Sequence, residues 1–83
     1  MSITTEDTRE LVGAAVRRVV PDADLTDVDP DADLRQTFEL DSLDFLGFVE
    51  LLSERSGVRI EEEDYPALRS LESITTFLQE RVS

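Results

Sequence analysis

The spacing of apolar residues constrains the fold of this chain more than any other feature. In the first segment they recur at i, i+1, i+4, i+5, i+8 and i+9, which is the pattern of a helix with one apolar side. These residues are Leu11, Val12, Ala15, Val16, Val19 and Val20. We therefore expect a first helix from about Thr5 to Val20, capped by Thr4 or Thr5 and ended by Pro21.

Two further segments carry helical signals of the same kind. A second helix should begin at Ser42 and end near Ser56, because Gly57 supplies the left-handed conformation that closes many helices. Ser70 can cap a last helix. The apolar residues of that last helix stand at helical spacing and are Leu71, Ile74, Phe77 and Leu78.

The remaining segments contain no strand signal. Glu61 to Ala67 is limited by Pro66 to a turn or a short helix. The fold class we predict is therefore all-α, a small bundle of three main helices plus one short helix.

A long segment, residues 21–40, joins the first two helices. It lacks a sustained period, and it contains Pro30 and six aspartates, which are Asp22, Asp24, Asp27, Asp29, Asp31 and Asp33. A loop of this length is unusual in a compact domain. Apolar residues are nevertheless spaced through it as possible anchors, namely Leu25, Val28, Leu34, Phe38 and Leu40. We expect a long loop packed on the core, with one helical turn near Asp33 to Thr37.

Size and charge exclude several classes of protein. A chain of 83 residues has material for one domain, spanning 1–83, and we expect a monomer. Its formal net charge of −12 argues against nucleic acid and anionic membranes as partners. No apolar stretch approaches the roughly eighteen residues of a membrane span. The absence of Cys and of a signal-like beginning makes the cytoplasm the expected location.

The second helix has two apolar sets, which a purely structural helix would not need. One set, expected in the core, consists of Phe45, Phe48, Val49 and Leu52. The opposite side consists of Leu43, Leu46, Gly47, Glu50, Ser53 and Glu54. Leu43 and Leu46 should therefore face solvent, framed by carboxylates. Exposed apolar residues with an acidic rim indicate a docking surface for a basic partner.

The tripeptide Asp41-Ser42-Leu43 stands at the start of this helix. Taken alone, Ser42 would be a helix cap, although Asp41 could itself be the cap. A phosphodiester on Ser42 would lie at a helix N-terminus, where free backbone N–H groups and the positive end of the dipole partly offset its charge.

These segments together carry a specific resemblance. The motif Leu40 to Asp44, the helix that follows it to Gly57, and the segment from Ser70 to Leu78 resemble the acyl carrier protein family over essentially the whole chain. The resemblance implies that Ser42 carries 4′-phosphopantetheine, whose terminal thiol holds acyl groups as thioesters. It also implies a freestanding carrier for fatty acid, polyketide or related biosynthesis.

The same resemblance implies the partners. They would be a phosphopantetheinyl transferase and acyl-loading or acyl-transferring enzymes with basic docking patches. The positions that typically meet such enzymes are occupied by Asp41, Leu43, Asp44, Leu46, Glu50 and Glu54. The approach Phe38 to Asp41 resembles the acyl or D-alanyl type, whereas carriers of peptides more often have a Gly-rich approach. Gly47 departs from the acidic residue that many fatty acid carriers have there, and Tyr65 and Ile74 are bulkier than the residues the family often has around its acyl cavity.

Single features of the sequence also bear on three other functions. A serine hydrolase needs a general base, and the chain has neither His nor Lys, so we expect no catalytic residue and no enzyme. Asp29-x-Asp31-x-Asp33 resembles the start of an EF-hand loop, but Leu34 and Leu40 stand where the invariant Gly and the bidentate Glu belong. We therefore expect no dedicated metal site, and calcium binding stays an alternative as a loose association of divalent cations with the acidic loop. A non-covalent acidic adaptor, with Ser42 only as a cap, stays open, as does an aminoacyl or D-alanyl cargo.

Overall fold

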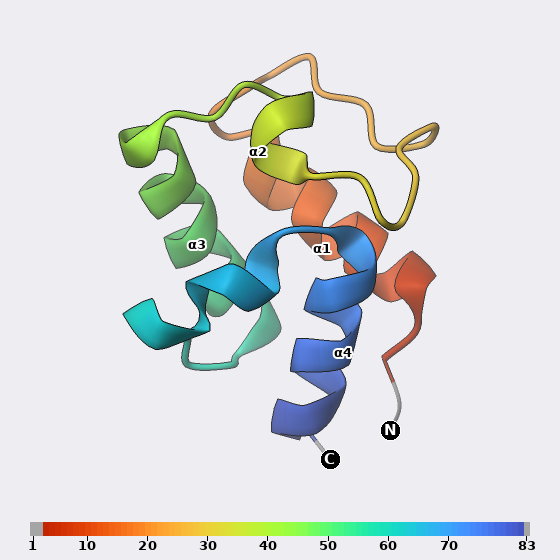
Figure 1. Cartoon of the computed structure of the whole chain (residues 1–83), viewed down its shortest axis with the longest axis vertical. Helices are drawn as coiled ribbons and strands as arrows, with labels where there is room; N and C mark the ends of the chain where they lie inside the picture. The colour runs from red at the N-terminus through yellow and green to blue at the C-terminus, as the bar shows by residue number, and fades with distance from the viewer. Residues whose placement is uncertain (1–2, 83) are drawn as a thin grey trace.

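Helices make up all the regular structure in the computed structural model, which describes residues 3–82. In chain order these are α1 Thr5–Val16, α2 Leu34–Thr37, α3 Ser42–Ser56, the 3-10 helix η1 Glu62–Leu68, and α4 Leu71–Val82. Helix α1 packs against both α3 and α4, and η1 packs against α4 (Figure 1). The all-α bundle of three main helices is thereby confirmed, with two short helical segments. The ends of the expected 1–83 domain, residues 1, 2 and 83, lie outside the described residues.

Local capping signals explain where the main helices begin and where α3 ends. Thr4 is the N-cap of α1 and forms a capping box with Asp7, in which each backbone N–H donates to the other side chain at 3.1 Å. Helix α3 ends at Ser56, and its C-cap is Gly57, whose φ of 72° lies in the left-handed region. At the start of α4, the Ser73 N–H donates to Ser70 Oγ at 3.1 Å. The predicted bounds of α3 and the predicted Ser70 cap are confirmed.

The end of α1 differs from the prediction. The helix ends at Val16, four residues before the expected Val20. Beyond it two hydrogen bonds are of the tighter i→i−3 type, from the Arg18 N–H to the Ala15 carbonyl at 3.3 Å and from the Val19 N–H to the Val16 carbonyl at 3.0 Å. The Val20 N–H also donates to the Val16 carbonyl, at 2.7 Å. Val19 and Val20 are half-buried in this turn, and Val20 packs against the core. Their apolar spacing therefore reflects burial in a tight turn and not another turn of α-helix.

The core lies where α1, α3 and α4 meet, with contributions from the loop and η1. Its fully buried side chains include Val12, Val16, Phe48, Leu52, Leu68, Leu71, Ile74 and Leu78. The hydroxyl oxygens of Thr8 on α1 and Thr75 on α4 lie 2.7 Å apart inside this core. Every buried side-chain nitrogen or oxygen of the described residues has a hydrogen-bond partner, so the interhelical packing carries no unpaired polar group.

The long loop between α1 and α2 is fastened to the bundle in its middle and near the start of α2. The Arg9 guanidinium on α1 donates to the Leu25 carbonyl and, at 2.9 Å, to the Val28 carbonyl. Near α2, the Leu34 N–H donates to the Arg69 carbonyl at 2.8 Å, and the Glu72 N–H donates to the Pro30 carbonyl at 2.8 Å. The predicted packing of this loop on the core is confirmed, and so is the helical turn, which is α2.

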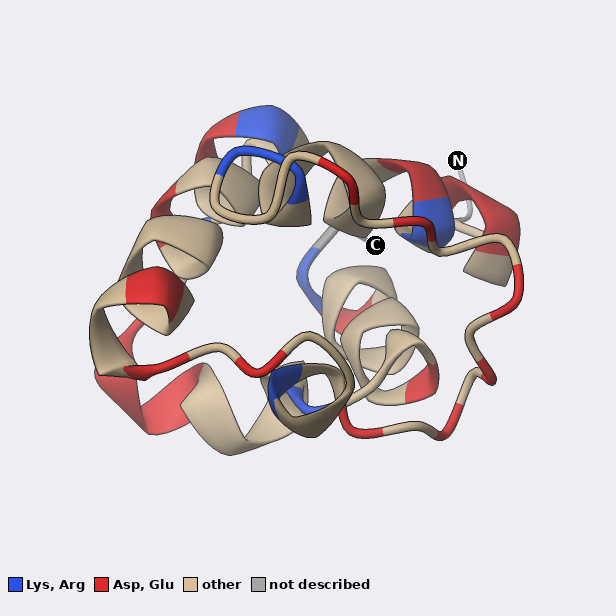
Figure 2. Ribbon diagram, turned by 90° about the horizontal axis from the view of Figure 1, so that it is seen from above, with Lys and Arg blue, Asp and Glu red and all other residues tan. Residues whose placement is uncertain are grey.

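The loop carries its charge on the outside. Figure 2 shows acidic residues spaced along it, and Asp22, Asp24, Asp27, Asp29 and Asp31 are exposed. One of these carboxylates has a local partner: the Thr26 N–H donates to Asp24 Oδ1 at 2.9 Å. This backbone hydrogen bond lowers the pKa of the Asp24 carboxyl from its ordinary value.

Candidate functional site

Asp41 and Ser42 occupy different positions at the start of α3. Asp41 is the N-cap, and its Oδ1 accepts a hydrogen bond from the Asp44 N–H at 2.8 Å. Ser42 is the first residue of the helix, so the reading of Ser42 as the cap is wrong. Its side chain is exposed, and among the described residues its hydroxyl has no hydrogen-bond partner. The hydroxyl is therefore accessible without disruption of the helix start.

The segment before the site is held in place by its own hydrogen bonds. Leu40 is 5% exposed, and its N–H donates to the Arg35 carbonyl at 2.9 Å. Glu39 has a φ of 52°, in the left-handed region that residues other than glycine rarely adopt. This bend, together with the buried Leu40 side chain, directs the chain from α2 into the Asp41 cap.

The two sides of α3 differ in exposure as predicted. Phe45, Phe48, Val49 and Leu52 are buried. On the other side Leu43 is 79% exposed and Leu46 is 42% exposed. Glu50 and Glu54 are exposed, as is Asp41, whereas Asp44 is half-buried. We call Leu43, Leu46, Glu50 and Glu54 the docking face.

Two residues assigned to this outer side lie elsewhere. Gly47 is half-buried, and a Cβ atom at this position would lie 3.6 Å from Val19 Cγ1. Ser53 is half-buried, and its hydroxyl donates to the Val58 carbonyl at 2.7 Å. Helical periodicity placed both residues on the exposed side, because it takes no account of other segments that pack on the helix. The turn after α1 covers Gly47, and the chain after Gly57 contacts Ser53. The exposed surface of α3 is therefore narrower than predicted.

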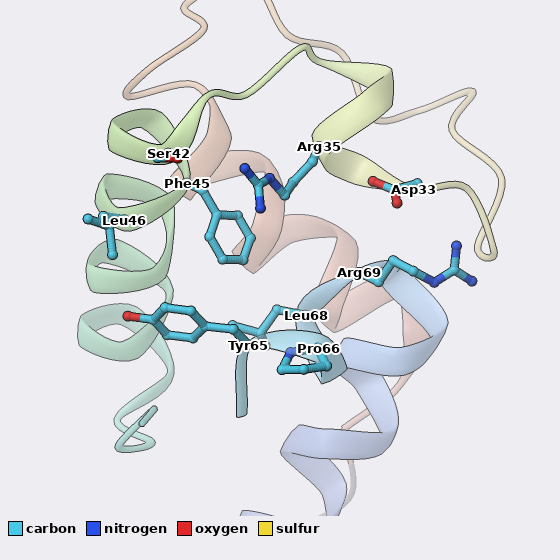
Figure 3. A pocket seen from close by; sticks show the side chains of 9 residues that line it. All are labelled: Asp33, Arg35, Ser42, Phe45, Leu46, Tyr65, Pro66, Leu68 and Arg69. Carbon is cyan, nitrogen blue, oxygen red and sulfur yellow. The ribbon is translucent and has the colours of Figure 1, made fainter. Parts of the chain in front are cut away.

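A pocket of about 440 Å³ opens beside Ser42, between α2, α3 and η1 (Figure 3). Its lining residues are Asp33, Arg35, Ser42, Phe45, Leu46, Tyr65, Pro66, Leu68 and Arg69. The Tyr65 ring meets the Phe45 ring edge-on, with the centroids 5.5 Å apart. Tyr65 thus lies at the cavity as the resemblance implied, whereas Ile74 is fully buried in the core and does not line it.

Arg35 is one of the pocket residues that sequence analysis missed, together with Pro66, Leu68 and Arg69. The guanidinium carbon of Arg35 lies 4.8 Å from the centroid of the Phe45 ring. One feature of the sequence could have indicated Arg35: the predicted helical turn at residues 33–37 contains this arginine and comes shortly before Asp41-Ser42-Leu43. The turn gave no indication of which neighbour the side chain would meet, because that depends on how α2 packs on α3.

Other kinds of site have little support in the described part of the chain. Between residues 3 and 82, no group of three or more His, Cys, Asp or Glu side chains is arranged to hold a metal ion. No helix in that range has both the length and the apolar character needed to cross a bilayer.

The all-α fold and the exposed serine at the start of α3 agree with one class of protein, small helical carrier domains that hold a prosthetic group on a serine. The family model described as phosphopantetheine attachment site matches residues 9–78. The chain belongs to this family, whose domains carry 4′-phosphopantetheine covalently on a serine and act as carriers without catalytic activity of their own. Membership implies interaction with a phosphopantetheinyl transferase and with acyl-handling enzymes. A comparison with curated proteins gave no match.

Proposed function

We propose that Ser42 carries the 4′-phosphopantetheine group and that the protein is a freestanding carrier of acyl thioesters. The observation that carries this proposal is the exposed, unengaged Ser42 hydroxyl at the first position of α3, made available because Asp41 serves as the cap. The first-turn amides of a helix have no partner within the helix and favour an anion nearby, so a phosphodiester fits this position.

The attachment reaction uses one group of this chain. The Ser42 hydroxyl oxygen forms a new P–O bond to the pantetheine-bearing phosphorus of coenzyme A, and the bond to adenosine 3′,5′-bisphosphate breaks. The hydroxyl proton leaves to a base of the transferase. The prosthetic group then supplies the thiol that forms thioesters, because the chain contains no Cys.

The docking face is the surface we assign to partner enzymes. Leu43 and Leu46 offer apolar contact, and Glu50 and Glu54 flank them with negative charge. Asp41 and Asp44, on either side of Ser42, add carboxylates close to the attachment point. A partner with a basic patch around an apolar pocket is complementary to this arrangement.

For the cargo we propose a chemical class and not a single compound. An acyl group of fatty acid, polyketide or related biosynthesis agrees with the apolar wall formed by Phe45, Leu46, Tyr65 and Leu68. An aminoacyl or D-alanyl unit is the alternative cargo, and the cytoplasmic location stays a prediction.

Intact mass measurement tests the attachment site. Incubation with coenzyme A, Mg²⁺ and a broad-specificity phosphopantetheinyl transferase should add one phosphopantetheine to the wild-type protein and to Ser56→Ala, a control at the far end of the same helix. Ser42→Ala should gain no mass while it keeps its helical circular dichroism. Modification of Ser42→Ala to the wild-type extent would refute the assignment.

A further inference from the structure

The Arg35 guanidinium brings a positive charge to the pocket beside Ser42. In Figure 3 the Arg35 side chain extends from α2 toward α3 and ends over the Phe45 ring, which lies between Ser42 and Tyr65. Arg69 also lines the pocket, but Figure 3 shows its guanidinium directed away from α3. Arg35 is therefore the cation that a group entering this pocket from Ser42 would meet.

The guanidinium of Arg35 is not neutralised by a nearby carboxylate. Within residues 3–82, the arginines that form ion pairs are Arg9, Arg59 and Arg81, which pair with Glu6, Glu61 and Asp64. Arg35 forms no ion pair in that range. Asp33 is the one carboxylate among the described lining residues, and its Oδ1 accepts the Gln36 N–H at 3.1 Å as the cap of α2.

The stacked geometry suits anion binding. A guanidinium that lies on an aromatic ring is held in orientation by the ring, while the N–H donors at its edge stay free for two parallel hydrogen bonds to an oxyanion. This preorganisation lowers the entropy lost on binding. The positive charge of Arg35 is also needed because the protein has a net charge of −12. Without a nearby cation, an anion at Ser42 would be repelled.

We propose that Arg35 is the anion-binding residue of this pocket and that it binds an oxyanion of the group attached to Ser42. Two sources supply that chemistry, the phosphodiester of the arm and a carboxylate on its cargo. The inference rests on the proposed function, because it requires an arm on Ser42. It predicts that acid-bearing cargo, or the arm itself, is held against the pocket by Arg35.

The chain offers a clean experiment, because it has no Cys and the arm therefore carries the sole thiol of the holo protein. Alkylation of that thiol with iodoacetate or iodoacetamide attaches groups of nearly equal size that differ in charge. A longer ω-iodoalkanoate and its amide extend the comparison deeper into the pocket. The proteins are wild type, Arg35→Gln, and the control Arg55→Gln, which makes the same charge change on the side of α3 that faces α1.

Thermal melts of the apo, holo and alkylated forms distinguish the two sources. If the carboxylate is bound, the acid form of wild type and of Arg55→Gln melts about 2 to 5 °C above the amide form, and Arg35→Gln loses that difference. If the phosphodiester is bound, the change in melting temperature from apo to holo becomes less favourable in Arg35→Gln by a similar amount, and the acid and amide forms melt together. Because each comparison is made within one variant, a general loss of stability does not imitate either result.

A result without any effect of Arg35 would contradict the proposal. Equal apo-to-holo shifts and equal acid-to-amide differences in wild type and Arg35→Gln would overturn the assignment of Arg35. Intact mass separates this failure from failure of the proposed function: modified protein without an Arg35 effect refutes the anion site alone. Absence of any modification at Ser42 would refute both.

Discussion

Asp41 and Ser42 divide two tasks at one helix end. The Asp41 carboxylate caps α3 by accepting the Asp44 N–H at 2.8 Å, and Ser42 keeps its hydroxyl exposed. A serine that acted as the cap would use its hydroxyl oxygen as a hydrogen-bond acceptor inside the protein. At the scale of single residues, the separation of the cap from the proposed attachment point is what keeps Ser42 accessible.

This separation predicts different stabilities for two adjacent variants. Asp41→Ala should lose about 1 kcal/mol of the free energy of unfolding, because an N-cap is removed. Ser42→Ala should change it by less than about 0.5 kcal/mol, because the side chain is exposed and alanine favours helix. Urea denaturation followed by circular dichroism measures both. Equal losses in the two variants would contradict the assignment of the cap.

At the scale of elements, Arg9 links α1 to the long loop. Its guanidinium donates to the carbonyls of Leu25 and Val28, and no short-range sequence signal indicated this contact. Arg9→Met should lower the free energy of unfolding by about 2 kcal/mol, because two charge-assisted hydrogen bonds are lost. Arg18→Met, an exposed residue just after the same helix, is the control and should have little effect. A similar loss in both variants would show that Arg9 does not hold the loop.

Substitutions on the docking face of α3 should weaken recognition by the phosphopantetheinyl transferase. Leu43→Ala should lower the kcat/KM of the phosphopantetheinyl transferase about fivefold or more, because an exposed apolar anchor is removed. Glu50→Arg should slow association and weaken its dependence on salt. Glu72→Arg, an exposed position on α4, should leave the transferase kinetics near wild type. Kinetics that respond to Glu72→Arg but not to the α3 variants would move the docking surface away from α3.

The sequence predicted a helix correctly where residues at its two ends determine where it begins and ends. The bounds of α3 followed from Ser42 and Gly57, and its buried side followed from helical periodicity. The end of α1 was wrong because Val19 and Val20 continue the apolar pattern while the backbone tightens into a turn. Periodicity reports which side chains are buried, and a buried turn satisfies it as well as a helix does.

Part of the candidate site could likewise be predicted from the sequence, and part of it depends on tertiary packing. Ser42 and the exposed Leu43 and Leu46 belong to one helix, so their arrangement followed from the sequence alone. The pocket needs α2, α3 and η1 together, and the contact of Arg35 with Phe45 depends on tertiary packing. Gly47 was misplaced for the same reason, because its neighbour Val19 comes from a distant part of the chain.

At the scale of the whole molecule, unbalanced negative charge should limit stability. The exposed aspartates of the long loop and the run Glu61-Glu62-Glu63-Asp64 should repel more strongly in the folded protein than in the expanded chain. NaCl should therefore raise the melting temperature, since the Debye length is about 8 Å at about 0.15 M ionic strength. Millimolar Mg²⁺ or Ca²⁺ should act at lower concentration by association with the carboxylates. A melting temperature that is flat or falls with both additions would show that self-repulsion does not limit the fold.

The central claim is that Ser42 is the residue that carries the prosthetic group. Because the chain has Arg but no Lys, trypsin cleaves after Arg35 and Arg55 and releases residues 36–55, which contain Ser42 and Ser53. Fragmentation of this peptide from the holo protein in a mass spectrometer assigns the added mass to one of the two serines. We predict phosphopantetheine on Ser42 and an unmodified Ser53. Added mass on Ser53, or on any peptide outside 36–55, would contradict the account.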